Sequence, residues 1–580
     1  MSTYLSSTYL SVRSLESLNG LWDFSFLGDV DVRSFLPEGC EACGKMPVPG
    51  AFDALPAYAG KRGVAIYRTR FLLPAGKRGR IEFGAVSMWA RVYVDGATLG
   101  ENACGYAPFH VDVPASESTE RELVVLVDNR FDFARVPMHG PQFDFYQYGG
   151  ILRDVTLHVL PGQGAWIDSL QVTPTSNYNE GEVSIAVAIK DEAAAEITCE
   201  VQFDRGAPQT FHCIPLVEGV GRLLLSVPKA RLWSPQAPHL HRLRVILLDA
   251  DGTPSDDMEA RFGLRRVEGR SGALWLNGEK LRLRGYNRHE WHPSTGPCTS
   301  SLQMVADLQL LRDLGCNFVR GSHYPQDQRF LDLCDELGFL VWEENLGWGQ
   351  REDCFASAKF KADHDATLRA MVRTSYNHPS VIIWGFLNEA GTDQDYVREC
   401  FEQTTATLRK LDPSRLVTYA SMFGAADTCF DLADIVSINL YPGWYGCEGT
   451  AQPLEMIAPA LQETFDAIDA RGFGEKPIIL SEIGAEGLYG WHDVHGDFFT
   501  EEYQAGYLSR ACLAVLSNPR VSGIALWQFC DTRTYGGGRS LNRPRTFNNK
   551  GTVDEFRRPK AAYQAVRALF RAAADKACNP

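Results

Sequence analysis

The sequence predicts a multidomain α+β protein in which two β-sandwiches precede a (β/α)8 barrel. Three observations lead to this prediction. The chain has 580 residues, enough for about three or four domains. Its composition, 45% hydrophobic and 22% charged, is that of an ordinary globular protein. The hydrophobic pattern also changes near residue 266, from closely spaced β segments to apolar runs that alternate with helical patterns.

The first half of the chain reads as short strands separated by turn residues. Examples are residues 67–73, 90–94 and 123–127. Strands of this kind favour β-sandwiches. A break is expected at Pro161–Gly164, and strands at 183–189 and 241–248 beyond it indicate a second, smaller sandwich.

The second half alternates buried apolar runs with amphipathic segments. Helices are expected at Met304–Leu314, Asp327–Leu337 and Lys361–Asn377. The apolar runs lie at 281–285, 318–320, 339–342, 381–386, 435–438, 477–481 and 523–527. Runs of four to six residues between helices indicate parallel βα units, and roughly eight such units fit a (β/α)8 barrel.

Composition and charge exclude several classes of protein. The formal net charge of −15 gives no general attraction to nucleic acid. No window approaches about 18 consecutive apolar residues, so no membrane span is expected. The polar N-terminus lacks the apolar core of a signal peptide, which predicts a cytoplasmic protein.

The cysteines indicate a reducing compartment. There are 15, an odd and scattered set, so free thiols are expected. Cys40 and Cys43 form one CxxC, which supplies half of a zinc site. A loop that carries two thiols is the preferred reading, and a redox role is the alternative.

Two carboxylates follow different strands of the predicted barrel. Glu389 comes after the run at 381–386, and Glu482 after the run that ends at Leu480. Reactive side chains of such barrels lie at the carboxyl ends of strands. One protonated and one ionised carboxyl group, facing each other, are what glycoside hydrolysis needs. The alternative is that each glutamate forms an ordinary salt bridge at its strand end. Because two glutamates follow apolar strands, and Asn388 precedes one of them, the catalytic interpretation is preferred.

Aromatic and polar residues end further strands. His323, Asn439, Tyr441, Tyr445 and Trp527 occupy such positions. Aromatic faces and hydrogen-bonding groups beside carboxylates suit a sugar. For any one of these residues alone, core packing or a structural histidine is the alternative.

Several motifs resemble glycoside hydrolase family 2, in the order in which that family carries them. They are Asn19-Gly-Leu-Trp22, Pro47-Val-Pro-Gly50, Gln147-Tyr-Gly-Gly-Ile-Leu-Arg153, Leu276-Asn-Gly-Glu-Lys280, Arg284-Gly-Tyr-Asn-Arg-His289, Val319-Arg-Gly-Ser-His-Tyr-Pro325, Asn377-His-Pro-Ser-Val381, Trp384-Gly-Phe-Leu-Asn-Glu389 and Leu480-Ser-Glu482. The resemblance implies a jelly-roll domain at 1–162, an immunoglobulin-like sandwich at 163–265 and the catalytic barrel at 266–580. It further implies a retaining mechanism without metal or cofactor, in a protein that is usually a homo-oligomer. Glu389 would be the acid/base and Glu482 the nucleophile.

A further segment resembles the β-glucuronidases of this family. Asn548-Asn-Lys550 looks like their Asn-x-Lys motif, which grips the sugar carboxylate. The resemblance extends to Asp144 and to the Asn439–Tyr445 segment as substrate contacts. Arg545 is the arginine expected to reach the substrate. A surface turn at 548–550 is the alternative reading, and related β-galactosidases carry similar residues there.

Two features bear on specificity. The segment between Trp348 and Asn377 is too short for a long loop over the aglycone, so an open aglycone side is expected, suited to an oligosaccharide or a bulky conjugate. Arg351 could favour the axial hydroxyl of a galacturonide, and a solvated loop arginine is the slightly preferred alternative. The leading hypothesis is hydrolysis of β-D-glucuronides. The alternatives are a β-galacturonidase, a β-galactosidase for neutral sugars, and a non-catalytic carbohydrate-binding protein.

Overall fold

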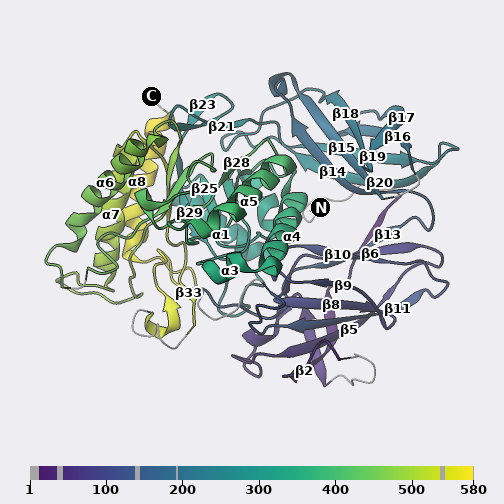
Figure 1. Ribbon diagram of the computed structural model, residues 1–580, viewed down its shortest axis with the longest axis horizontal. Helices are drawn as coiled ribbons and strands as arrows, with labels where there is room; N and C mark the ends of the chain where they lie inside the picture. The colour runs from purple at the N-terminus through teal and green to yellow at the C-terminus, as the bar shows by residue number, and fades with distance from the viewer. Residues whose placement is uncertain are drawn as a thin grey trace.

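The structure is a computed structural model that describes residues 12–35, 43–136, 144–190, 194–447, 449–535 and 543–578. Three parts are visible in Figure 1, where the two sandwiches lie to the right and the barrel to the left. The predicted multidomain α+β architecture is confirmed.

The first part consists of three antiparallel sheets around one core. A four-stranded sheet has the order β1 (Ser14–Ser17), β13 (Val155–Leu160), β6 (Arg78–Phe83), β10 (Phe109–Val113). A six-stranded sheet has the order β3 (Gly44–Val48), β2 (Gly20–Gly28), β5 (Val64–Leu72), β11 (Glu120–Asp128), β8 (Trp89–Val94), β9 (Ala97–Asn102). A small sheet joins β4 (Gly50–Ala51), β12 (Gly150–Ile151) and β7 (Val86–Ser87), beside the turn η1 (Phe52–Ala54). Inward side chains such as Trp22, Tyr67 and Phe83 are almost fully buried between the two large sheets.

The second part is a sandwich built from seven antiparallel strands. Their order is β14 (Trp166–Pro174), β15 (Glu182–Lys190), β18 (Val220–Ser226), β17 (Gln209–Val217), β16 (Glu196–Phe203), β19 (His241–Leu248), β20 (Pro254–Phe262), with η2 (Tyr178–Glu180) after β14. Alternate residues face inward, so that Ile185 and Val187 share one core with Leu243 and Val245.

The third part is a closed barrel of parallel strands. Their order is β28 (Leu416–Thr418), β27 (Val381–Gly385), β26 (Leu340–Glu344), β25 (Phe318–Gly321), β24 (Leu283–Arg288), β32 (Val521–Leu526), β31 (Ile478–Glu482), β30 (Val436–Asn439), β29 (Ala420–Ser421). Because only Tyr419 separates β28 from β29, these two segments act as one strand and close an eight-stranded ring. The sheet of β21 (Val267–Arg270), β22 (Ala273–Leu276) and β23 (Glu279–Leu281) packs its apolar side chains against the first residues of the barrel strands.

Helices surround the ring. They are α1 (Ser301–Asp313), α2 (Gln328–Leu337), α3 (Glu352–Ala356), α4 (Ala358–Ser375), α5 (Arg398–Leu411), α6 (Ile457–Ile468), α7 (Glu501–Ser517) and α8 (Ala561–Cys578). Side-chain caps at Ser300, Asp327 and Thr500 accept a backbone N–H from the first turns of α1, α2 and α7. The fifth unit departs from the pattern, because the short turn η4 (Gly424–Ala426) stands where a helix would follow β29.

Short elements complete the barrel domain. They are η3 (Asp395–Val397), η5 (Pro453–Met456), η6 (Asp469–Phe473), η7 (Pro544–Thr546), β33 (Thr532–Arg533) and β34 (Phe547–Asn548). No helix among the described residues combines the length and the apolar character needed to cross a lipid bilayer.

A loop of the first part reaches the carboxyl end of the barrel. The backbone N–H of Tyr146 donates to the carbonyl of Arg533 (2.8 Å), and the hydroxyl of Tyr148 accepts from Trp291 Nε1 (3.0 Å). Asp144, two residues before Tyr146, therefore lies beside the strand ends of the barrel.

Candidate active site

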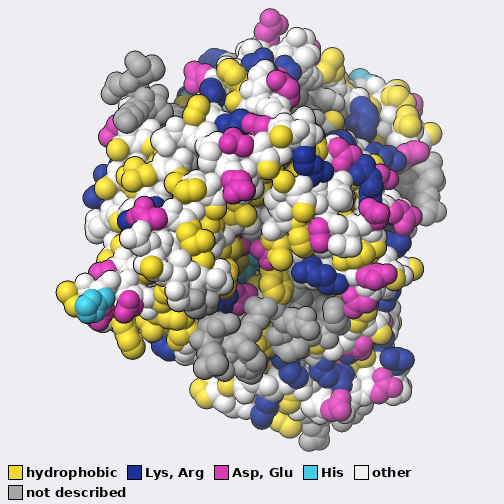
Figure 2. Space-filling view, turned by 60° about the vertical axis from the view of Figure 1, so that its left-hand side comes forward, with side chains coloured by type: hydrophobic (Ala, Val, Ile, Leu, Met, Phe, Trp, Pro, Cys, Tyr) yellow, Lys and Arg dark blue, Asp and Glu magenta, His cyan; other side chains and the backbone are white. Residues whose placement is uncertain are grey.

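A cavity of about 710 Å³ opens at the carboxyl end of the barrel. Glu389, just beyond β27, and Glu482, the last residue of β31, both line it. The other lining residues are Asp144, Phe145, His323, Trp348, Met422, Asn439, Leu440, Tyr441, Pro442, Tyr445, Ala460, Thr464, Trp527 and Arg543. Figure 2 shows a hollow near the middle of this face, with acidic, basic and histidine side chains in it.

Glu482 receives two strong hydrogen bonds. Arg320 Nη1 donates to its Oε1 (2.7 Å), and the hydroxyl of Tyr441 donates to its Oε2 (2.7 Å). Arg320 is fully buried at the end of β25, where Glu344 accepts from its Nε (2.9 Å) and Nη2 (3.0 Å). This arrangement holds the Glu482 carboxylate in one orientation, with both oxygens bound by donors.

Glu389 has a different environment. Its Oε1 accepts one hydrogen bond, from the neutral amide Nδ2 of Asn439 (2.9 Å). Its backbone lies in the left-handed region, with φ of 52°. For a residue other than glycine such a conformation persists where the surroundings hold it, and it is often found at active sites.

The two carboxyl groups share a proton unequally. Burial raises the pKa of both, and repulsion by the charge of Glu389 raises the pKa of Glu482 further. Two such groups hold one proton between them near neutral pH. Burial and the charge of Glu389 outweigh the opposing effects of Arg320 and Tyr441 and raise the pKa of Glu482 to about 8, while Asn439, Arg320 and Arg351 oppose the rise in the pKa of Glu389. One carboxyl group of the pair is therefore protonated and the other ionised, which is the state that an acid and a nucleophile require.

Three further predicted residues surround this pair. Asn388 is fully buried; its Oδ1 accepts from Arg320 (2.9 Å), while its Nδ2 has no partner among the described residues. His323 lies over Trp527 in a stacked arrangement, with 5.2 Å between the ring centres. Burial lowers the pKa of His323, so its imidazole is neutral. An unpaired amide donor and a flat indole face are suited to a sugar hydroxyl and a sugar ring.

Charged groups gather around Asp144 at one end of the cavity. The Asp144 carboxylate accepts from Arg543 Nε (2.9 Å) and Nη2 (2.5 Å), and from Asn548 Nδ2 (2.8 Å). Arg543 Nη2 also donates to the hydroxyl of Tyr445 (2.9 Å). The sequence prediction placed Asp144, Asn548 and Tyr445 in one pocket. In the structure Asp144 and Tyr445 line the cavity, and Asn548 is buried and bonded to Asp144 without being among the described lining residues.

Lys550 lies behind this group. Its side chain is fully buried, and its Nζ donates to Glu486 Oε1 (3.3 Å) and lies 5.1 Å from the ring centre of Tyr445. Glu486 also accepts from Arg543 Nη1 (2.6 Å). Glu486 thus connects the two cations that lie nearest to this end of the cavity.

The structure places the predicted Arg545 elsewhere. Its guanidinium donates to Glu555 (3.0 Å) and to Asn549 (2.9 Å), and Arg545 is not among the described residues that line the cavity. Arg545 lies within the turn η7 with φ of 64°, and its guanidinium is paired with Glu555. Arg543, two residues earlier, occupies the position expected for Arg545.

Sequence reasoning missed several residues of the site. Arg320, Glu344 and Glu486 form its ion pairs, and Arg543 lines its cavity. Position gave a usable signal for the first two, since Arg320 is the last residue but one of β25 and Glu344 is the last residue of β26. Glu486 lies four residues after the nucleophile candidate in an irregular segment, where no periodic pattern indicates the direction of a side chain.

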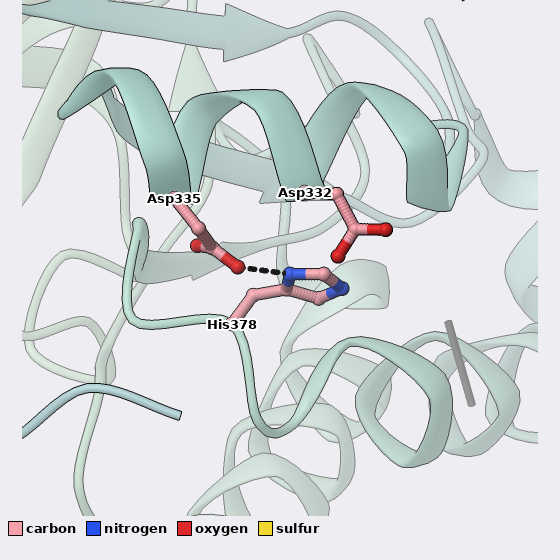
Figure 3. A group of neighbouring side chains, drawn as sticks. All are labelled: Asp332, Asp335 and His378. Atoms are coloured by element: carbon pink, nitrogen blue, oxygen red, sulfur yellow. Dashed lines mark hydrogen bonds and ion pairs between the residues drawn. The ribbon is translucent and has the colours of Figure 1, made fainter. Parts of the chain in front are cut away.

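A separate cluster of Asp332, Asp335 and His378 has the composition of a metal site (Figure 3). In it His378 Nδ1 lies 2.5 Å from Asp335 Oδ2, and Arg261 of β20 donates to Asp332 (2.5 Å). The potential ligand atoms are engaged by one another and by a cation, so the cluster is an ion-pair network between the second sandwich and the barrel. Of the CxxC pair, Cys43 is exposed, and Cys40 lies outside the described residues.

Comparison with known protein families identifies the family of this chain, and that family agrees with the pair of carboxyl groups in the cavity. Residues 165–265 match the model "Glycosyl hydrolases family 2", and residues 267–574 match "Glycosyl hydrolases family 2, TIM barrel domain". The chain belongs to glycoside hydrolase family 2. As a member of this family it is a hydrolase, and the predicted resemblance is confirmed.

Solved and curated members of the family are similar over nearly the whole chain. A β-galacturonidase from Eisenbergiella tayi, bound to galacturonate, is 34% identical with a TM-score of 0.87, over 97% of this chain and 98% of that one. A β-glucuronidase from Faecalibacterium prausnitzii is 25% identical with a TM-score of 0.85, over 98% of this chain and 99% of that one. A β-glucuronidase from Paenibacillus borealis is 27% identical over 96% of this chain and 97% of its own length.

Proposed function

We propose that this family 2 member hydrolyses terminal β-linked uronic acids, with net retention of configuration. One observation supports this most directly: Glu389, Glu482 and Arg543 line one cavity, and the buried Asn548 and Lys550 are joined to Arg543 through Asp144 and Glu486. An anionic sugar needs such donors in a site from which water is excluded. The names of the relatives, β-glucuronidases and a β-galacturonidase, support the same substrate class.

The proposed reaction has two steps. In the first, Glu389 protonates the glycosidic oxygen while Glu482 attacks C1, and a glycosyl ester forms as the leaving group departs. In the second, water attacks C1, Glu389 takes a proton from it, and Glu482 leaves as a carboxylate. Retention requires the two carboxyl groups to lie about 5–5.5 Å apart.

We assign the remaining residues by their positions in the cavity wall or by their contacts with residues of that wall. Lys550, Asn548 and Arg543 would bind the sugar carboxylate, Asp144 and Tyr445 the neighbouring hydroxyls. The unpaired Nδ2 of Asn388 would donate to a hydroxyl near C1, and Trp527 would pack against the ring. His323 and Asn439 would hold these groups and the acid in place.

The leaving group would occupy the rest of the cavity. Beyond the carboxylates the wall consists of Trp348, Met422, Pro442 and two residues of α6, and Met422 is 44% exposed. The segment between Trp348 and Asn377 forms α3 and α4, which supports the expectation of an open aglycone side.

Galacturonides are a second candidate substrate, favoured by the 34% identity to the Eisenbergiella tayi enzyme. Turnover of p-nitrophenyl β-D-glucuronide, β-D-galacturonide and β-D-galactoside at equal concentrations tests both proposals. Preference for either uronide supports the proposed class, and the ratio of the two identifies the C4 epimer. Faster turnover of the neutral galactoside would refute it.

The cellular location and the oligomeric state of the protein are two further proposals. We propose a cytoplasmic location, supported by free, buried thiols in the described part of the chain such as Cys316, Cys334 and Cys512. We also propose a homo-oligomer, which light scattering of the purified protein would test; a monomer would refute it.

A further inference from the structure

The segment Gly347–Arg351, which follows β26, lies along the turn that carries Glu389. The backbone N–H of Asn388 donates to the carbonyl of Gly347 (3.0 Å), and the N–H of Gly349 donates to the carbonyl of Asn388 (2.8 Å). The N–H of Gly391 then donates to the carbonyl of Gln350 (3.1 Å). These bonds make a short parallel pairing on either side of Glu389.

Arg351 completes this pairing with its side chain. Its Nη1 donates to the backbone carbonyl of Glu389 (2.8 Å) and to the carbonyl of Gln350 (3.1 Å). On the other side, the N–H of Glu389 donates to the carbonyl of Ala420 (2.9 Å). Both backbone polar groups of Glu389 are therefore held, one by the neighbouring strand and one by a guanidinium.

The backbone of the turn needs such support. Glu389 has φ of 52° and Leu387 has φ of 43°, and neither residue is a glycine. Left-handed conformations of such residues are unfavourable and persist where neighbouring groups fix them. A relaxed turn would redirect the carboxyl group, and proton transfer to a leaving group requires hydrogen-bond geometry.

Charge acts together with geometry. The positive charge of Arg351 lowers the pKa of Glu389, against the burial that raises it. The other charged groups that face Glu389 are Arg320, Asp144 and Glu482. Of the two cations, Arg320 is engaged by Glu344 and Glu482, whereas Arg351 is engaged by the backbone of Glu389 itself.

We infer that Arg351 is a positioning residue for the general acid, which it serves by holding the Glu389 turn through the backbone carbonyl. The inference rests on the proposed function, in which Glu389 is the acid. It replaces the interpretation in which Arg351 reaches a sugar hydroxyl, because the side chain binds protein backbone and is not among the described residues that line the cavity. Arg351 is exposed and lies in a loop, as the other sequence interpretation expected, and the inference adds a role to it.

The test compares two leaving groups. A 2,4-dinitrophenyl uronide, whose leaving group departs without protonation, is compared with the phenyl uronide of the same sugar, whose leaving group needs the acid. Arg351→Met removes the donor, Arg351→Lys retains a cation, and Arg369→Met serves as a matched control. Arg369 lies on α4 and is paired with Asp365, one turn earlier on the same helix.

For Arg351→Met we expect kcat/KM on the phenyl uronide to fall about tenfold or more, within the range that general acid catalysis contributes. We expect a change of less than about threefold on the dinitrophenyl uronide, for which the acid contributes little. The alkaline limb of the pH profile should move to higher pH, and Arg351→Lys should restore part of the loss. Equal losses on both substrates, or no loss on the phenyl uronide, would overturn the inference.

Glu389→Gln separates this inference from the proposed function. Should that variant show no dependence on the leaving group, the acid role of Glu389 itself fails. Should it show the dependence while Arg351→Met does not, the role of Arg351 alone is wrong.

Discussion

Replacing Lys550 by methionine should impair uronide hydrolysis while it spares the fold. The Lys550 side chain and its partner Glu486 are fully buried. In the proposed complex Lys550 also pairs with the sugar carboxylate. Truncating one partner of such a buried charge pair costs about 2–5 kcal/mol of binding free energy. At about 1.4 kcal/mol per factor of ten, kcat/KM for the uronide should fall about 30- to 4,000-fold.

The same change should have little effect on a neutral substrate. The methyl ester of the same p-nitrophenyl uronide has no charge for the ammonium group, so its kcat/KM should change by less than about threefold. Glu486 keeps its bonds from Arg543 (2.6 Å) and Asn549 (3.1 Å), which limits the loss of stability.

The assay measures release of nitrophenol from both substrates, with Lys359→Met as control. Lys359 is partly exposed and paired with Asp363 within α4. Thermal unfolding checks that each variant is folded. Equal losses on the uronide and its ester would refute the role of Lys550 in binding the carboxylate.

Three further predictions concern acid–base groups. Because burial raises the pKa of Glu389, which must be protonated to act as the acid, the alkaline limb of kcat/KM should lie above the usual glutamate value of about 4.3; a limb at or below that value would contradict the assignment. Tyr441→Phe removes a donor to Glu482, so kcat/KM should fall about 10- to 100-fold and the acid limb should move to higher pH; an unchanged acid limb would contradict the contact. Burial lowers the pKa of His378, but the charge of Asp335 raises it more, so the pKa of His378 is higher in the folded protein than in the unfolded chain. The stability that this pair contributes is therefore complete below the unfolded pKa and is lost as pH rises through the folded pKa. Melting curves of wild type and His378→Gln should therefore converge as pH rises through that pKa, and a constant difference would refute it.

The fold and the two carboxylates were predictable because they follow from local patterns. Apolar runs predicted the barrel strands, and the carboxyl ends of parallel strands meet at one face, so Glu389 and Glu482 had to lie near each other. The absence of a helix from the fifth βα unit was not predictable from such a pattern. The segment after β29 reaches β30 through the single turn η4, and the apolar runs on both sides look ordinary.

The charged end of the site was less predictable. Arg543 and Arg545 are two residues apart in an irregular segment, and no periodic pattern there indicates which of the two guanidinium groups enters the cavity. Glu486 was overlooked for a related reason, since its role depends on contacts with Arg543 and Lys550, both more than fifty residues away. Such contacts depend on tertiary structure that no periodicity encodes.

Covalent trapping tests the central proposal most directly. Wild-type protein would be incubated with the 2-deoxy-2-fluoro-β-glucuronosyl, galacturonosyl and galactosyl fluorides, followed by mass spectrometry of the intact chain and its peptides. A retaining uronidase should accumulate one uronosyl group from at least one of the two uronosyl fluorides, faster than any galactosyl group, on the peptide that contains Glu482. Absence of a label, a label on another residue, or faster labelling by the galactosyl fluoride would contradict the account.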